Sequence, residues 1–222
     1  KYYSMTLAAD GTVYGYGLNS NGQLGDNTVT FKISPMRVLK GNYIGTTFLG
    51  DYYANPIISI TANENRSAAL AADGTIYAFG YNANGQLGDN TTTLRLVPVR
   101  VLKGLYAGNT FLGDSSGNPI VAISMGTFHS SALAADGKMY TWGANIFGQL
   151  VDGTVTQRLT PVRTLKGVYL GASFLGDDAA NPIVSIAGAG NHNTAITKDG
   201  FVFSFGYNNA GQLGDSTLTT RL

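Results

Sequence analysis

The chain has 222 residues, no cysteine and a formal net charge of +1, and only 12% of its residues are charged. This composition supplies no basic surface of the kind that binds nucleic acid. The absence of cysteine excludes disulfides, thiol catalysis and Cys-based zinc sites, and no apolar run reaches the roughly 20 residues of a membrane-spanning helix. We therefore expect no nucleic-acid partner and no membrane span.

A repeat of 63 residues organises the whole sequence. Residues 64–126 and 127–189 are identical at 35 of 63 positions without a gap. Units of this length predict a propeller or solenoid, in which each unit buries its apolar face against its neighbours. We expect a single repeat array over 1–222, with phases 1–63, 64–126 and 127–189 and a partial phase 190–222. The turn that marks each phase is an Asp-Gly pair: Asp10-Gly11, Asp73-Gly74, Asp136-Gly137 and Asp199-Gly200.

Within the second unit, residues 67–72 and 75–80 flank the Asp-Gly turn and predict a β-hairpin. A third strand is expected at 98–102, and likewise at 35–39 and 161–165, where a leading proline suits a strand start. Residues 119–124 predict a fourth strand. Four short strands per unit, with no helical period, predict an all-β propeller of four-stranded blades with about three and a half repeats present.

The second hairpin strand and the loop after it carry the expected packing positions. Trp142 stands in an aromatic column with Tyr16, Phe79 and Phe205, and we expect this column to lie between blades. Each copy of the loop has the sequence Gly-Gln-Leu, and its leucine is expected to fill the space between adjacent blades. Aspartates that follow the loop are expected to accept backbone donors. The remaining structural positions are Gly22, Leu24, Gly85, Leu87, Leu150 and Leu213.

These residues resemble the regulator of chromosome condensation repeat family. The resemblance rests on Phe79-Gly80-Tyr81-Asn82, on the Gly-Gln-Leu-Gly loops, on Pro-Val-x-Val, and on His129-Ser130-Ser131-Ala132-Leu133. It implies a seven-bladed propeller of four-stranded blades. Two positions of the family histidine are Tyr3 and Arg66 here, and the loop over 103–118 is longer than in the eukaryotic exchange factor.

Members of that family include a nucleotide exchange factor for a small GTPase, scaffolds and secreted bacterial proteins, and fold alone does not choose among them. The wording of the repeats and the lack of cysteine resemble the secreted bacterial members most. We expect a noncatalytic binding or assembly module, extracellular or on the cell surface, that contacts a protein, a glycan or other copies of the chain. The alternative is a guanine-nucleotide exchange factor in the cytoplasm.

Several apparent catalytic or ligand motifs have plainer interpretations. His129 and His192 share one repeat phase, which predicts a structural position whose ring hydrogen-bonds a neighbouring strand or loop. Ser130, Ser131 and Asp136 near His129 evoke a hydrolytic triad, but Asp136 belongs to a turn that recurs four times. The glycines at 188–190 lack the helix that a dinucleotide fingerprint needs. We expect no enzyme activity, no cofactor and no metal.

The loop at 103–118, with copies at 40–55 and 166–181, is the expected interaction surface, because binding residues gather on loops of rigid scaffolds. The other interpretation is that this loop only covers blade edges. Both ends of the chain carry the same half-repeat, so we expect a piece of a longer array or copies that join end to end. The candidate contact residues are Tyr52, Tyr53, Tyr106, Ser115, Ser116, Tyr169 and Asp178.

Overall fold

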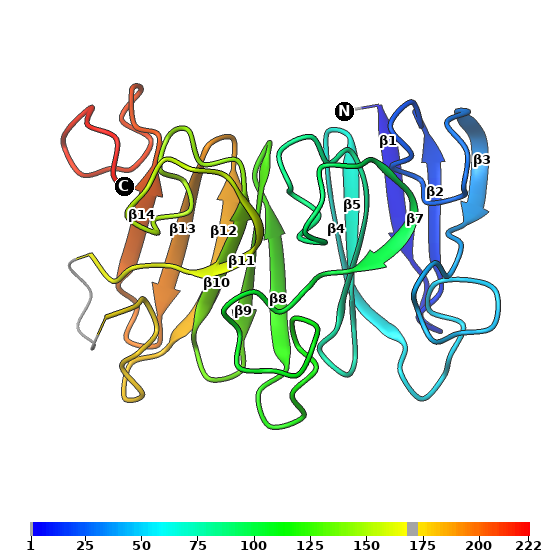
Figure 1. Cartoon of the computed structure of the whole chain (residues 1–222), viewed down its shortest axis with the longest axis horizontal. Helices are drawn as coiled ribbons and strands as arrows, with labels where there is room; N and C mark the ends of the chain where they lie inside the picture. The colour runs from blue at the N-terminus through cyan, green and yellow to red at the C-terminus, as the bar shows by residue number, and fades with distance from the viewer. Residues whose placement is uncertain (1, 168–172) are drawn as a thin grey trace.

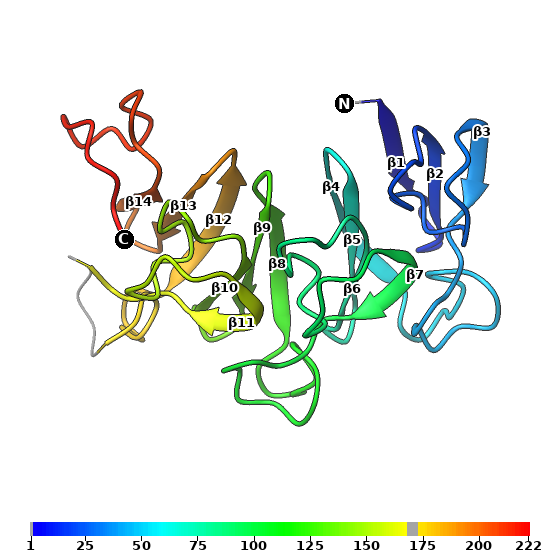
Figure 2. The same cartoon turned by 45° about the horizontal axis from the view of Figure 1, so that its top comes forward.

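The computed structural model describes residues 2–167 and 173–222, and these residues form an all-β structure (Figure 1). No helix in these ranges is long and apolar enough to cross a membrane. The sheets stand side by side in chain order as blades (Figure 2). The strands are β1 Tyr3–Leu7, β2 Val13–Gly17, β3 Lys32–Arg37, β4 Ile57–Asn63, β5 Arg66–Ala71, β6 Ile76–Gly80, β7 Arg95–Arg100, β8 Ile120–Met125, β9 His129–Ala134, β10 Met139–Gly143, β11 Arg158–Arg163, β12 Ile183–Ala189, β13 His192–Thr197 and β14 Val202–Gly206.

Among the described residues, two blades have four strands and two have three. The complete blades are β4-β5-β6-β7 and β8-β9-β10-β11, and every pairing in them is antiparallel. The flanking blades are β1-β2-β3 and β12-β13-β14. Each complete blade takes its first strand from the end of one repeat phase and its other three strands from the next phase. The chain is therefore a β-propeller array of four-stranded blades.

The predicted hairpin is confirmed, whereas the third strand begins earlier than predicted. Strands β5 and β6 pair from Arg66↔Gly80 to Leu70↔Ile76 across the Asp-Gly turn. The third strand, β7, begins at Arg95 and contains Pro98 in its interior. This is possible because β7 is an edge strand, which tolerates a residue without an N–H. The Pro98 carbonyl accepts a hydrogen bond from Asn42 N of the preceding repeat at 2.9 Å.

Trp142 lies between blades, as expected, and Phe79 and Phe205 likewise belong to apolar clusters that join adjacent blades, whereas Tyr16 is only partly buried. The Trp142 side chain is 2% exposed, and its indole Nε1 donates to the Gln86 carbonyl of the preceding blade at 3.0 Å. The same carbonyl accepts from Ser130 Oγ at 2.8 Å. Ser67 makes the corresponding bond to the Gln23 carbonyl at 2.9 Å. Trp142 and Leu87 belong to one buried apolar cluster that joins the two complete blades.

The Gly-Gln-Leu loops form the other half of each interface between blades. Leu24, Leu87 and Leu150 are fully buried, and Leu213 is nearly so. Gly22 and Gly85 both have φ +70°, and a Cβ on either would collide with a leucine of the next outer strand, Leu96 or Leu159. Glycine is therefore required at these turns by conformation and by space.

The loop aspartates accept backbone donors, as predicted. Asp26 accepts from Thr28 N at 3.0 Å and pairs with Lys32 at 3.0 Å. Asp152 accepts from Thr154 N at 3.0 Å and pairs with Arg158 at 2.5 Å. These contacts join the loop to the start of its own outer strand.

The first residues of β1, β5, β9 and β13 form a column from blade to blade. The Tyr3 hydroxyl donates to the Arg66 carbonyl at 2.5 Å, and Arg66, 1% exposed, donates to the carbonyls of Gly126 and His129 at 2.9 and 2.6 Å. His129 is also buried, as a structural position should be. The polar side chain that its ring meets is that of Asn193 on β13 of the next blade, although no atom pair between them has the distance and angle of a regular hydrogen bond. Burial lowers the pKa of His129 to about 3.

Candidate functional site

The loop at 103–118 is a braced hairpin that leaves the outer strand of one blade and leads to the inner strand of the next. Leu102 and Phe111 form a β-bridge, and Lys103 N donates to the Thr110 carbonyl at 3.0 Å. The Asp114 carboxylate accepts from the backbone N–H groups of Thr110 and Phe111 at 2.7 and 2.9 Å. Burial opposes ionisation of Asp114, but these hydrogen bonds outweigh it and lower its pKa. The loop is thus held by its own polar groups.

A second brace is a stack of arginine on phenylalanine in each copy of the loop. The Arg100 guanidinium lies 4.8 Å from the Phe111 ring centre, a cation–π geometry. Arg37 on Phe48 and Arg163 on Phe174 repeat it at 5.1 and 4.3 Å. These stacks tie the loop to the outer strand that precedes it.

Tyr106 is not available to a partner, in contrast to the prediction. Its side chain is 2% exposed, its hydroxyl donates to the Asn118 carbonyl, and its ring packs edge-on against Tyr140 with the centroids 5.6 Å apart. Burial raises the pKa of Tyr106. Every copy of the loop has a tyrosine at this position, for example Tyr43 in the loop at 40–55. This repetition was the sequence signal for a structural role. Tyr169 lies outside the described residues.

The tips of the loops carry the exposed side chains. Tyr53 is 91% exposed and Tyr52 is 39% exposed. Ser116 is exposed, whereas Ser115 and Asp178 are partly buried, and Asp178 accepts from Ala180 N at 3.0 Å. Sequence reasoning missed two aliphatic residues beside the buried tyrosines, Ile44 at 53% and Leu105 at 62% exposure. We call Tyr52, Tyr53, Ile44, Leu105 and Ser116 the tip surface.

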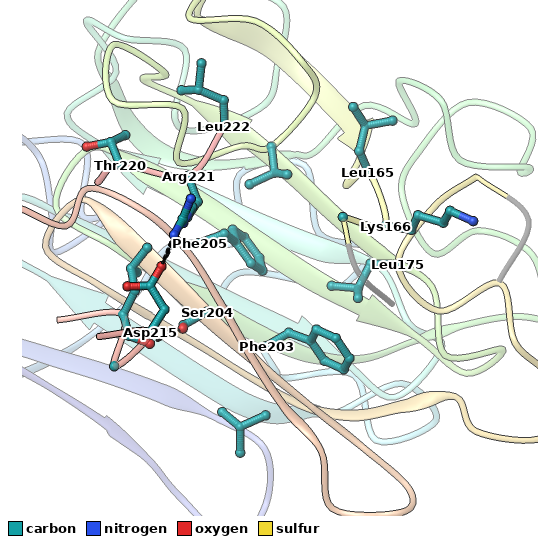
Figure 3. Close-up of a pocket in the computed structure, with 15 residues that line it drawn as sticks. Leu165, Lys166, Leu175, Phe203, Ser204, Phe205, Asp215, Thr220, Arg221 and Leu222 are labelled. Carbon is teal, nitrogen blue, oxygen red and sulfur yellow. Dashed lines mark hydrogen bonds and ion pairs between the residues drawn. The ribbon is translucent and has the colours of Figure 1, made fainter. Parts of the chain in front are cut away.

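A groove of about 720 Å³ lies beside β14, between the third and fourth blades (Figure 3). Leu175 and Phe205 form part of its apolar wall, and both are buried. Asp215 and Arg221 form an ion pair of 2.6 Å at its rim. Hydrogen bonds from Thr217 and Arg221 lower the pKa of Asp215 to about 2. The groove therefore combines apolar side chains with polar and charged ones.

The side chains that resemble catalytic groups in the sequence form structural hydrogen bonds and ion pairs instead. Ser130 Oγ donates to the Gln86 carbonyl, and Asp136 pairs with Lys138 at 2.7 Å. Gly188–Gly190 overlap the end of β12, and Gly188 N donates to Ser124 Oγ at 2.8 Å. Among residues 2–167 and 173–222, no group of three or more His, Asp or Glu side chains is placed to hold a metal ion.

Known proteins share both the sequence pattern and the fold. The chain is 30% identical over 221 residues to the probable E3 ubiquitin-protein ligase HERC6 of Homo sapiens, covering 97% of this chain and 18% of that protein. It is 27% identical over 212 residues to the ultraviolet-B receptor UVR8 of Arabidopsis thaliana, covering 96% and 41%. The chain thus spans less than half the length of these relatives.

Two solved structures have the same fold at low identity. Human WBSCR16 superposes with a TM-score of 0.77 and 21% identity, covering 100% of this chain and 49% of that chain. Yeast RCC1 (Prp20), solved bound to Kap60, superposes with a TM-score of 0.72 and 19% identity, covering 100% and 45%.

Family models agree with the repeat pattern. The model for the regulator of chromosome condensation (RCC1) repeat matches residues 73–133 and 136–196, and a second model of the same description matches residues 57–86 and 120–149. The first model alone covers more than half of the chain. The chain belongs to the regulator of chromosome condensation repeat family.

Proposed function

We propose that the chain is a noncatalytic protein-binding module whose tip surface contacts the partner. The observation that carries the proposal is the exposure of Tyr53 and Ile44 on the loop at 40–55 and of Leu105 on the loop at 103–118, both of which have braced backbones. Exposed aromatic and aliphatic side chains on a rigid support lose little conformational entropy when a partner covers them. The yeast relative supports the same role by analogy, since its solved structures concern binding to Kap60, Gsp1p and histones.

The test compares two exposed tyrosines on different parts of the molecule. Tyr53 is 91% exposed on the tip surface, and Tyr2 is 83% exposed beside the start of β1. A photoreactive phenylalanine analogue replaces one or the other, and the protein is irradiated with extract of the native host. We expect discrete cross-linked partners from position 53 only, displaced by excess unlabelled wild-type chain. Excess chain carrying Tyr53→Ser and Leu105→Ser should not displace them.

The proposal fails if both positions yield the same products, or if the double variant displaces them as well as wild type. An exchange factor is the alternative, and the similarity to the yeast protein studied with Gsp1p is the observation in its favour. Release of fluorescent GDP from the host's small GTPases separates the two functions. A binding module leaves the release rate unchanged, whereas an exchange factor accelerates it.

The proposed setting is the cell surface or the extracellular medium, where the module would present its tip surface to a protein or a glycan or join copies of itself. The proposal rests on the resemblance of the repeats to secreted members of the family. Antibody labelling of intact and permeabilised host cells tests it. Labelling only after permeabilisation would argue for the cytoplasmic alternative.

A further inference from the structure

The end of the blades opposite the tip surface carries aromatic side chains at the interfaces on both sides of the third blade. Because the strands of a blade are antiparallel, the turn between β8 and β9 and the loop between β10 and β11 lie at the end away from the loop at 103–118 (Figure 1). Phe128 lies on that turn, and Phe147 lies on that loop. We call the following residues the aromatic surface: Tyr81, Phe128, Ile146, Phe147 and Tyr207.

Two pairs of rings each span an interface between blades. Tyr81, which follows β6, has its ring centre 6.4 Å from that of Phe128 in the next blade. Phe147 has its ring centre 4.5 Å from that of Tyr207, which follows β14 in the fourth blade. Phe128 is 37% exposed and Ile146 is 70% exposed, whereas the other three residues are partly buried. The blades on both sides of each pair are within the chain, so each ring meets a partner that the chain itself supplies.

Packing between blades does not require the rings of Phe128 and Phe147. Buried interface positions keep one type of residue from copy to copy, as the leucines of the Gly-Gln-Leu loops do. The equivalents of Phe128 and Phe147 do not keep it: they are Tyr2, Asn65 and Asn191 for the first, and Asn21, Asn84 and Ala210 for the second. Apolar side chains that replace polar ones at exposed positions mark an interaction site, since the fold gains little from them.

Each tyrosine of the aromatic surface has an asparagine beside it. The N–H of Tyr81 donates to the Asn65 carbonyl at 2.9 Å, and the N–H of Tyr207 donates to the Asn191 carbonyl at 3.0 Å. Both asparagines are partly exposed, and their side-chain amides form no hydrogen bond with another described residue. These amides are therefore available to a ligand that lies against the rings.

The aromatic surface is poor in charge. No Asp, Glu, Lys or Arg stands within three positions of any of its five members in the sequence. Glu64 and Arg66 flank Asn65, but Arg66 is 1% exposed and donates to the carbonyls of Gly126 and His129. The surface thus offers rings and amides rather than ion pairs.

We infer that the aromatic surface binds a neutral oligosaccharide. The face of an aromatic ring carries partial negative charge and attracts the polarised C–H groups of a sugar ring. A side-chain amide both donates to and accepts from hydroxyl groups, so Asn65 and Asn191 can bind the sugar hydroxyls that point away from the rings. This site goes beyond the proposed function, because it is separate from the tip surface and lies at the other end of the blades.

The probes are end-labelled hexasaccharides of glucose, xylose, mannose, galactose and N-acetylglucosamine. Each is titrated into the 222-residue chain and followed by fluorescence anisotropy. We expect at least one of them to bind saturably. Its affinity should be the same in dilute buffer and in roughly 0.5 M sodium chloride, because salt screens ion pairs and the aromatic surface supplies none.

The variants use residues that the repeat already has at the same positions. Phe128→Asn and Phe147→Asn should each weaken sugar binding by roughly tenfold, because each removes a ring face. Both should melt close to wild type, since asparagine occupies these positions in other copies. Tyr53→Ser is the matched control: it replaces an exposed aromatic residue of the tip surface by the residue found at the equivalent Ser116, and it should leave sugar binding unchanged.

The inference is overturned if none of the five sugars binds saturably, or if Phe128→Asn and Phe147→Asn bind as tightly as Tyr53→Ser. Binding that disappears in the salt solution would also overturn it, because the contact would then be electrostatic. If no sugar binds and the same two variants lose cross-linked partners, the aromatic surface contacts a protein instead. A negative sugar result together with cross-linking at position 53 would refute the aromatic surface as a sugar site and leave the tip surface standing.

Discussion

Replacing Trp142 tests the packing between blades. Trp142→Phe substitutes the residue that Phe79 and Phe205 place in the same column, and it removes the indole hydrogen bond to the Gln86 carbonyl. That carbonyl keeps its bond from Ser130, so no buried acceptor is orphaned. The lost bond costs about 1 kcal/mol, and the smaller ring adds a cost of similar size. Trp142→Ala empties the site and should cost about 3–5 kcal/mol.

The assay is thermal unfolding followed by far-ultraviolet circular dichroism, which does not depend on the tryptophan. For a chain of this size, 1 kcal/mol shifts the melting temperature by about 2–4 °C. Trp142→Ala should therefore melt about 6–20 °C below wild type, with Trp142→Phe between the two. A Trp142→Ala variant that melts with wild type would refute the assigned facing of β10. Equal losses in both variants would show that the ring volume is not what matters.

Three further predictions follow from burial, space and loop bracing. His129 has a pKa of about 3 in the folded chain against an ordinary 6.5, so the stabilisation that its neutral ring provides is complete above pH 6.5 and is lost as the pH falls toward 3. Between pH 6.5 and 4.5 the free energy of unfolding should fall by about 2–3 kcal/mol for this reason. Urea titrations of His129→Asn should therefore show a shallower pH dependence than wild type. Gly113→Ala should lower the melting temperature, because φ is +92° and a Cβ would collide with the Gly74 carbonyl, whereas Gly117→Ala, with open space around it, should not; equal melting would contradict the close approach. Asp114→Ala should speed amide hydrogen exchange at Phe111 without changing it in β9. Unchanged exchange at Phe111 would show that Asp114 does not hold the loop.

The repeat itself made most of the fold predictable. Strict spacing located the hairpins, the leucine plugs and the interblade place of Trp142, because residues that recur at one phase must meet the same surroundings. The extent of β7 was not predictable in the same way. A proline can lie inside a strand only where that strand is the edge of its sheet, and the sequence of one repeat does not show which strand is the edge. The residue that donates a hydrogen bond to the Pro98 carbonyl, Asn42, comes from another repeat.

The site was only partly visible in the sequence. Tyr106 and Tyr53 are both loop aromatics, yet one is buried against Tyr140 and the other is exposed. Invariance across the copies distinguishes them in retrospect.

The bonds from Ser67 to Gln23, Ser130 to Gln86 and Asn193 to Gln149 all join residues 44 apart in sequence. Each interface joins residues that are the same number of positions apart in the chain. Duplicating or deleting one whole period therefore leaves every blade with the same contacts to a neighbour of the same kind. An insertion within a strand or within a Gly-Gln-Leu loop would displace these partners, whereas an insertion in a surface loop such as 103–118 would leave them in place. Recombination between repeats can thus change the length of the array in a single step without requiring new packing to evolve.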